Sequence, residues 1–160
     1  MFLTGAMSSL SSVMDNPVLR SYFTYATIVI LKMMLMSPLT SYFRLTRKVF
    51  ANLEDTKFAS PAIDKKLVGT DPDVERVRRC HLNDLENIVP FVVVGLLYAM
   101  TAPELSAALL HFRIFAAARI FHTVAYVCAL PQPSRALGFI VGLTVTFSMA
   151  YRVLRTVLLL

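Results

Sequence analysis

Polar side chains that could bind a charged ligand recur on one side of the segment that follows Asp71. At about 100° per residue of a helix, four polar residues fall within an arc of about 80°: Arg76, Arg79, Asn83 and Glu86. Because a carboxylate can hold an ammonium group while arginine binds carboxylates through paired hydrogen bonds, this stripe suits a zwitterionic ligand. The alternative is that the arginines are ordinary charged residues at a membrane border and that one of them pairs with Glu86.

A second stripe lies further along the chain, where His111, Arg119, His122 and Tyr126 share an arc of similar width on an otherwise apolar helix. Ionisable groups inside an apolar span are costly and usually functional. A hydrogen-bonded seam between helices explains the stripe equally well, so both interpretations stay open. No acidic residue lies near the two histidines to complete a metal site, and we expect no metal.

Arg135 follows a proline-marked turn at residues 131–134 and stands at the start of a predicted helix. A helix N-terminus beside a guanidinium group stabilises anions, including thiolates. The alternative is a charged anchor at the membrane border. Cys80 is a weak candidate for a catalytic nucleophile, because the sequence shows no base and orienting group for it.

The composition shows what kind of elements must hold these residues. Of 160 residues, 56% are hydrophobic and only 16% are charged. In soluble domains about 45–50% of the residues are apolar and about 25% are charged. So apolar a chain is not disordered, and two cysteines make no disulfide scaffold. A net charge of +6 in this setting favours loops beside an anionic membrane over nucleic-acid binding. The sequence therefore predicts an all-α membrane protein.

Four stretches are long and apolar enough to cross a membrane as helices. Short turns marked by proline join the later ones, so we expect antiparallel neighbours in an up-down four-helix bundle, with residues 1–160 forming a single integral-membrane domain. Asp71 and Pro72 should cap and begin the second helix. Lys32 interrupts the first span without a nearby acidic residue, and we expect it to snorkel or to be buried in the bundle. The expected spans are residues 21–43, 72–101, 104–130 and 134–155.

The distribution of charge predicts the orientation in the membrane. Nine of the 16 basic residues lie between Arg44 and Arg79, so the positive-inside rule places the loop 44–71 in the cytosol and both termini on the far side. Arg152 and Arg155 run against this trend. Residues 1–13 carry no basic residue, and we do not expect them to be a cleaved signal peptide.

The chain resembles a known family along most of its length. The run from Asp71 to Phe91, with Arg78-Arg79-Cys80-His81-Leu82-Asn83-Asp84-Leu85-Glu86 at its centre, is similar to the signature of the membrane-associated proteins in eicosanoid and glutathione metabolism, the MAPEG family. The resemblance extends over residues 22–160. Its further matches are residues 42–52, 110–113, 118–126 and 130–137.

The resemblance implies a homotrimer of four-helix subunits in the endoplasmic reticulum membrane, and often in the outer mitochondrial membrane, with lumenal termini. Glutathione would be the co-substrate, bound near the cytosolic side between subunits. Arg135 matches an arginine that family members need for activity, and Tyr126 would help it to stabilise the thiolate. The implied glutathione-binding residues are Arg44, Arg78, Arg79, His81, Asn83, Glu86, Arg119 and Tyr126.

The activity implied is that of a glutathione transferase and peroxidase acting on hydrophobic electrophiles and lipid hydroperoxides. The alternatives are a prostaglandin E synthase-like isomerase and a non-catalytic lipid-binding member. The synthase-like members follow the active-site arginine with a serine, whereas Ala136 follows Arg135 here. Some members carry an activating thiol in the cytosolic loop where this chain has Thr56, so we expect no thiol activation unless Cys80 takes that role.

Overall fold

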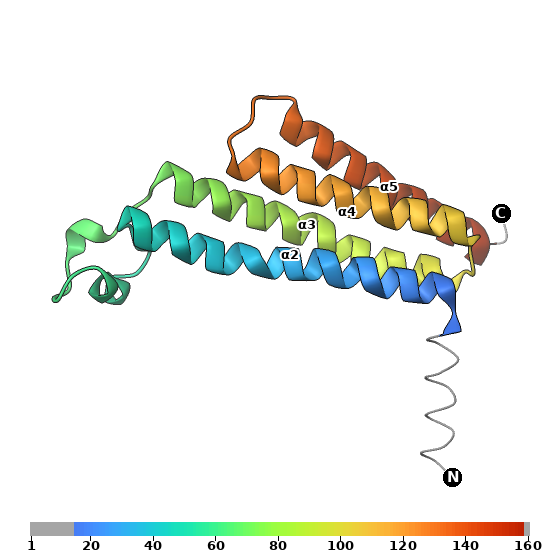
Figure 1. Cartoon of the computed structure of the whole chain (residues 1–160), viewed down its shortest axis with the longest axis horizontal. Coiled ribbons are helices and arrows are strands. Elements are labelled where there is room, and N and C mark those ends of the chain that lie inside the picture. Colours follow the sequence, from blue (N-terminus) through green and yellow to red (C-terminus); the bar gives the residue numbers. More distant parts are fainter. Residues whose placement is uncertain (1–14, 159–160) are drawn as a thin grey trace, which may run out of the picture.

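The computed structural model describes residues 15–158 and shows four long helices and two short 3-10 helices. The long helices run alternately up and down and lie side by side (Figure 1). The all-α, four-helix prediction is therefore confirmed, while the expectation about residues 1–13 lies outside the described residues. The elements are α2 (Pro17–Arg47), η1 (Glu54–Phe58), η2 (Lys65–Leu67), α3 (Pro72–Met100), α4 (Leu105–Val127) and α5 (Ser134–Val157).

Side-chain caps set the starts of three long helices. The carboxamide of Asn16 accepts hydrogen bonds from the amides that begin α2, at 2.9 and 3.2 Å. Asp71 does the same for α3 at 2.9 and 3.2 Å, with Pro72 as the first helical residue, as the sequence predicts. Glu104 caps α4 through the amides of Ser106 and Ala107. These caps fix where each polar segment gives way to a span.

Residues 48–71 fold at one end of the bundle, which we call the loop end (Figure 1). The turn at residues 101–104 joins α3 to α4 at the other end, which we call the α3–α4 end. Within the loop, Phe50 pairs with the backbone around Val68. Thr56 is fully buried there, and its hydroxyl donates to the carbonyl of Leu53 at 2.7 Å and accepts from the amide of Asp64 at 3.1 Å. The loop is thus held together by hydrogen bonds among its own residues.

The bundle interior is packed by aromatic and small residues. Phe91 of α3 stacks on Phe115 of α4 with ring centroids 3.7 Å apart. Gly138 lets α5 approach α4, since a Cβ atom there would lie 3.0 Å from the Cβ atom of His122 and 3.2 Å from the carbonyl oxygen of Ala118. Such close backbone approach through small residues is common between membrane helices.

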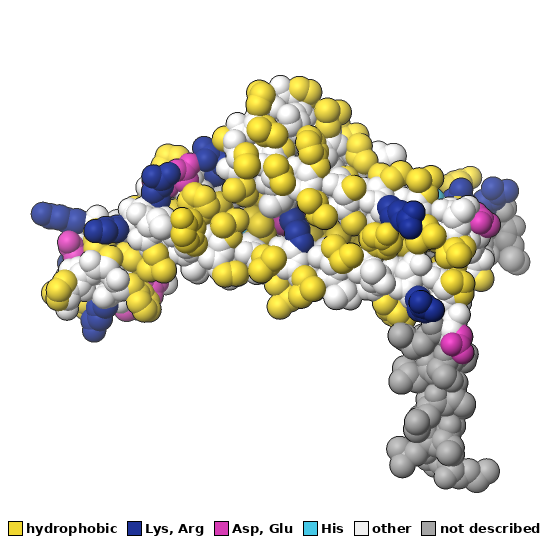
Figure 2. Space-filling view, in the orientation of Figure 1, with side chains coloured by type: hydrophobic (Ala, Val, Ile, Leu, Met, Phe, Trp, Pro, Cys, Tyr) yellow, Lys and Arg dark blue, Asp and Glu magenta, His cyan; other side chains and the backbone are white. Residues whose placement is uncertain are grey.

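The outer surface fits a lipid environment. All four long helices are long and apolar enough to cross a membrane. Large hydrophobic side chains are exposed along each of them. On the face drawn in Figure 2, hydrophobic side chains cover most of the middle, and charged side chains gather mainly toward the ends.

Candidate functional site

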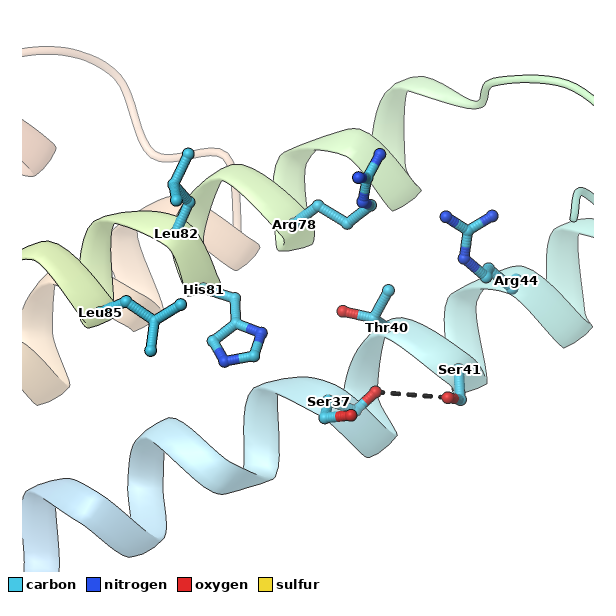
Figure 3. Close-up of a pocket in the computed structure, with 8 residues that line it drawn as sticks. All are labelled: Ser37, Thr40, Ser41, Arg44, Arg78, His81, Leu82 and Leu85. Atoms are coloured by element: carbon cyan, nitrogen blue, oxygen red, sulfur yellow. Dashed lines mark hydrogen bonds between the residues drawn. The ribbon is translucent and has the colours of Figure 1, made fainter. Parts of the chain in front are cut away.

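A polar cavity of about 320 Å³ lies between α2 and α3 at the loop end (Figure 3). Arg44 of α2 and Arg78 and His81 of α3 line it, so the structure brings three predicted site residues together. The ring of His81 points from α3 toward α2. Hydroxyl groups and two leucines complete the wall: Ser37, Thr40, Ser41, Leu82 and Leu85.

The two arginines of this cavity are only partly engaged by the protein. Arg78 pairs with Glu75 at 2.8 Å, and Arg44 donates to the carbonyl of Val49 at 3.5 Å. A guanidinium group has five N–H donors in a fixed fork. Both side chains therefore retain donors that can bind a carboxylate in the cavity.

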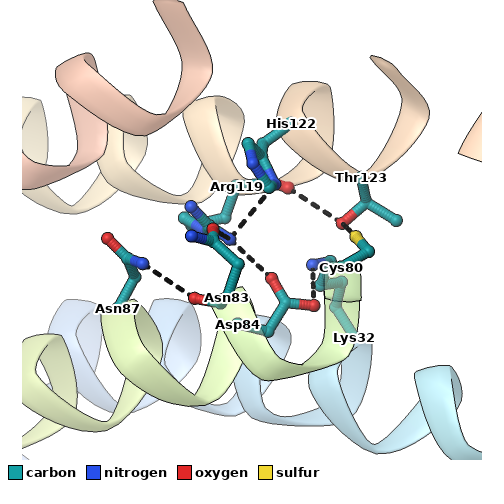
Figure 4. A network of polar contacts seen from close by, with 8 residues as sticks. All are labelled: Lys32, Cys80, Asn83, Asp84, Asn87, Arg119, His122 and Thr123. Carbon is teal, nitrogen blue, oxygen red and sulfur yellow. Dashed lines mark hydrogen bonds and ion pairs between the residues drawn. The ribbon is translucent and has the colours of Figure 1, made fainter. Parts of the chain in front are cut away.

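A second polar group lies inside the bundle and is centred on Arg119 of α4 (Figure 4). Its Nη2 donates to Asp84 Oδ1 at 2.7 Å and to Asn83 Oδ1 at 2.9 Å, and both Arg119 and Asp84 are 0% exposed. Lys32 of α2 pairs with the other carboxylate oxygen of Asp84. The Lys32 side chain is 14% exposed and thus mostly inside the bundle, and its partner comes from another helix.

Two basic side chains, Lys32 and Arg119, share the single carboxylate of Asp84 in this interior group. Arg119 Nε and Nη1 are buried without a hydrogen-bond partner among residues 15–158. His122 Nδ1 lies 3.3 Å from Arg119 Nη2. The group links α2, α3 and α4 through Lys32, Asp84 and Arg119. Of the second predicted stripe it contains Arg119 and His122.

A third group sits where α4 ends and α5 begins. The guanidinium carbon of Arg135, the second residue of α5, lies 4.8 Å from the ring centroid of Tyr126, which is a cation–π contact. The ring of Tyr126 in turn contacts that of His122, with centroids 5.4 Å apart. Arg135 Nε is buried and has no hydrogen-bond partner within the described part of the chain. Arg135 is therefore oriented by Tyr126 while one of its donors remains available.

The remaining predicted residues do not join these groups within one chain. Arg79 and Glu86 of α3 are exposed, and neither forms a hydrogen bond or ion pair with any residue between 15 and 158. His111, from the second stripe, bonds to Ser148 of α5 at 3.1 Å and to the carbonyl of Ala107 at 2.6 Å. The predicted stripes are therefore divided between the interior, the outer surface and the helix ends.

Sequence reasoning missed Asp84, which joins two basic residues from other helices. The signal was present in the helical spacing. Asp84 lies four residues after Cys80 and four before Ile88, and both of these are fully buried. A carboxylate on the apolar stripe of a helix must find a cationic partner inside the bundle.

No group of three or more histidine, cysteine or acidic side chains that could hold a metal lies together between residues 15 and 158. The chemistry that the cavity and the Arg135 group offer is the binding of anions. The cavity can take carboxylates, and the free donor of Arg135 at the N-terminus of α5 can stabilise a developing negative charge.

Comparison with known proteins gives consistent matches. The profile of the MAPEG family matches residues 22–155. Microsomal glutathione S-transferase 1 of Mus musculus is 58% identical over 151 residues, which cover 94% of this chain and 97% of that protein. The Homo sapiens protein of that name is 57% identical over 155 residues, covering 96% and 100%. Prostaglandin E synthase of Homo sapiens is 36% identical over 149 residues, covering 92% and 95%.

Proposed function

Because the chain belongs to the MAPEG family, we propose that it is a membrane-bound glutathione transferase that joins glutathione to hydrophobic electrophiles. The family resemblance seen in the sequence is confirmed, and the chain is a multi-pass membrane protein. Relatives named microsomal glutathione S-transferase 1 are 57–58% identical, against 36% for the prostaglandin E synthase. The higher identity therefore favours transferase activity over that of a synthase-like isomerase.

The observation that carries the mechanism is the placement of Arg135. A free thiol has a pKa of about 8.5, so little thiolate exists at neutral pH. Lowering that pKa by about two to three units needs about 3–4 kcal/mol of preferential stabilisation of the anion. The Arg135 guanidinium, held over Tyr126 with an unpartnered Nε, and the N-terminus of α5 are directed sources of this stabilisation.

The chemistry that follows is a single displacement. The thiol proton is lost to solvent, and the sulfur then forms a bond to the electrophilic carbon. The leaving group departs with the electron pair of the bond that breaks. The protein's residues hold the thiolate beside Arg135. They bind the charged ends of glutathione in the cavity between α2 and α3.

Glutathione is anchored by the cavity between α2 and α3. Arg44, Arg78 and His81 offer donors for its carboxylates. Arg119 donates a hydrogen bond to the side chain of Asn83, so we assign Arg119 a positioning role through Asn83. Arg79 and Glu86 lie on the exposed side of α3 and complete the site from a neighbouring subunit. The proposed assembly is the homotrimer that the family resemblance implies, because separate faces of α3 can then serve two sites.

The same bound thiolate supports a glutathione peroxidase activity toward lipid hydroperoxides that reach the site from the bilayer. Two glutathione molecules reduce one hydroperoxide to an alcohol and water and leave as the disulfide. We place the protein in the endoplasmic reticulum membrane and in the outer mitochondrial membrane. The basic loop between α2 and α3 then faces the cytosol, and both termini are lumenal.

The test is conjugation of glutathione to a chlorodinitrobenzene-type electrophile by the detergent-purified protein. We expect saturable turnover that depends on glutathione. A parallel assay offers a prostaglandin endoperoxide as substrate and measures its isomerisation. Isomerisation without conjugation would favour the synthase-like alternative, and binding of lipid without glutathione binding or turnover would favour the non-catalytic one.

A further inference from the structure

A second polar cavity, also of about 320 Å³, lies at the α3–α4 end of the bundle, away from the glutathione site proposed above. It is formed where α3 and α5 end. Its polar lining comes from both helices and from the turn after α3: Tyr98, Thr101, Tyr151, Arg152, Arg155 and Thr156.

Two arginine side chains line the cavity. Arg152 and Arg155 lie three residues apart on α5 and both line it, since residues at this spacing share a helix face. The carboxylate of Glu104 is also near Tyr98, but its oxygens are occupied in capping α4 through Ser106 and Ala107. Two basic side chains therefore line the cavity, and the oxygens of the nearby Glu104 accept hydrogen bonds from the start of α4.

Tyr98 provides an independent indication of a ligand. It is only 1% exposed, and its hydroxyl group is buried without a hydrogen-bond partner among residues 15–158. A buried hydroxyl group without a partner is destabilising. Because Tyr98 lines the same cavity as the two arginines, a ligand with acceptor oxygens would satisfy its O–H donor. A basic residue near a helix C-terminus also stabilises the helix, but that role accounts for neither the Tyr98 hydroxyl nor the shared cavity.

The position of the cavity narrows the chemistry of the ligand. Arg152 and Arg155 are in the last turns of a membrane-spanning helix, at the end where the positive-inside rule predicts few basic residues. The ends of membrane-spanning helices are expected at the depth of the lipid headgroups. The last turns of α3 and α5 also carry exposed hydrophobic side chains, since Met100, Leu154 and Leu158 are 69%, 56% and 58% exposed.

We propose that this cavity binds the phosphate group of an anionic membrane lipid. Arg152 and Arg155 bind the phosphate oxygens through charge-assisted hydrogen bonds, and the Tyr98 hydroxyl donates a further one. The site is separate from the glutathione site, and its test uses no glutathione. The result of this test is therefore independent of the proposed transferase activity.

The first experiment measures thermal unfolding of the delipidated protein in neutral detergent as phosphatidylglycerol is added. We expect a saturable rise in Tm that phosphatidylcholine does not match. The Arg152→Gln/Arg155→Gln variant should weaken the apparent affinity about tenfold or more. Arg20→Gln is the matched control, because Arg20 is exposed near the start of α2, at the same end of the bundle, and does not line the cavity.

The second experiment separates ligand binding from a structural role of Tyr98. Tyr98→Phe removes only the hydroxyl group, so in the absence of lipid its Tm should equal or exceed that of the parent protein. With phosphatidylglycerol present, the variant should gain several-fold less from the lipid. Loss of stability without lipid would instead give the hydroxyl a structural role.

Two further results would overturn the proposal. If the double variant responds to phosphatidylglycerol as strongly as the parent and Arg20→Gln proteins do, the lipid binds elsewhere. If inorganic phosphate or glycerol phosphate reproduces the full effect, the site takes a soluble anion and not a lipid.

Discussion

Two sources of positive potential meet at the start of α5, the guanidinium group of Arg135 and the N-terminus of the helix itself. The guanidinium carbon of Arg135 lies 4.8 Å from the ring centroid of Tyr126, and this cation–π contact orients the side chain. This contact fixes the direction of the remaining N–H donors without using them. The residue is thus prepared to bind an anion and needs little rearrangement when charge develops.

Replacing Arg135 should therefore affect the chemistry more than the fold. We expect Arg135→Ala to lower kcat by about 10²–10³, the cost typical of removing a directed donor from an anion site. Arg135→Lys should recover only part of the loss, because lysine keeps the charge but not the planar fork. Stopped-flow absorbance of the bound thiolate and conjugation kinetics measure the effect.

Arg113→Ala is the control, since Arg113 is an exposed arginine of α4 that bonds to Tyr25 at 3.0 Å, away from the site. An Arg135→Ala protein that forms thiolate as the parent does would remove Arg135 from the mechanism.

The two cysteines differ in accessibility. Cys80 is fully buried with its sulfur 3.8 Å from the hydroxyl of Thr123, whereas Cys128 is exposed in the turn between α4 and α5. N-ethylmaleimide should therefore label Cys128 alone and should not activate the enzyme, because Thr56 stands where the resemblance places the activating thiol. Mass spectrometry after labelling, with Cys128→Ser as the control, tests this. Several-fold activation, or labelling of Cys80 in the folded protein, would contradict it.

At the scale of the elements, the contact between α4 and α5 positions Arg135. Gly138 lies one turn after it, and a Cβ atom there would meet the backbone of Ala118 and His122 at 3.2 Å. We expect Gly138→Ala to destabilise the bundle by about 1–3 kcal/mol through overpacking. The same change should reduce conjugation activity because the start of α5 moves.

Gly142→Ala is the matched control on the same helix. Its added Cβ atom would lie 3.5 Å from Arg119 Cδ, an ordinary contact, and alanine favours a helix by about 1 kcal/mol over glycine. This variant should be neutral or more stable in thermal unfolding. Equal destabilisation of the two variants would show that the close contact between α4 and α5 at Gly138 does not cause the loss of stability.

The cap of α4 predicts a pH dependence. Hydrogen bonds from Ser106 and then from the amides of Ser106 and Ala107 hold the pKa of Glu104 below its ordinary value. A depressed pKa stabilises the folded state above the pKa of the unfolded chain, and this contribution is lost as pH falls through the lower folded value. The parent protein should therefore lose Tm on acidification faster than Glu104→Gln does. Parallel Tm curves between pH 7 and about pH 3 would contradict this.

At the scale of the whole molecule, the sequence predicted the four helices because length and hydropathy determine what spans a membrane, and Asp71-Pro72 marked where α3 begins. The interior contacts were harder to foresee. Lys32 and Asp84 are 52 residues apart and meet only because α2 packs on α3. Helical spacing places a residue on its own helix face, but the register between helices depends on packing, such as that around Gly138.

The division of the site residues among separate groups leads to a prediction about assembly. Arg44 and Arg78 face the cavity between α2 and α3, whereas Arg135 lies at the junction of α4 and α5. If each glutathione site takes the cavity from one subunit and Arg135 from the next, two different inactive subunits can complement each other. A site within one chain cannot be restored in this way.

We therefore predict complementation between Arg135→Ala and Arg44→Ala/Arg78→Ala subunits. The two variants are co-expressed with different affinity tags, and only complexes that carry both tags are purified. In the proposed trimer, each mixed complex then contains one complete site among three, so the conjugation rate should reach about a third of that of the parent protein. Each variant carrying both tags by itself is the control and should remain inactive. Mixed complexes no more active than these controls would place the cavity and Arg135 of each site in the same subunit.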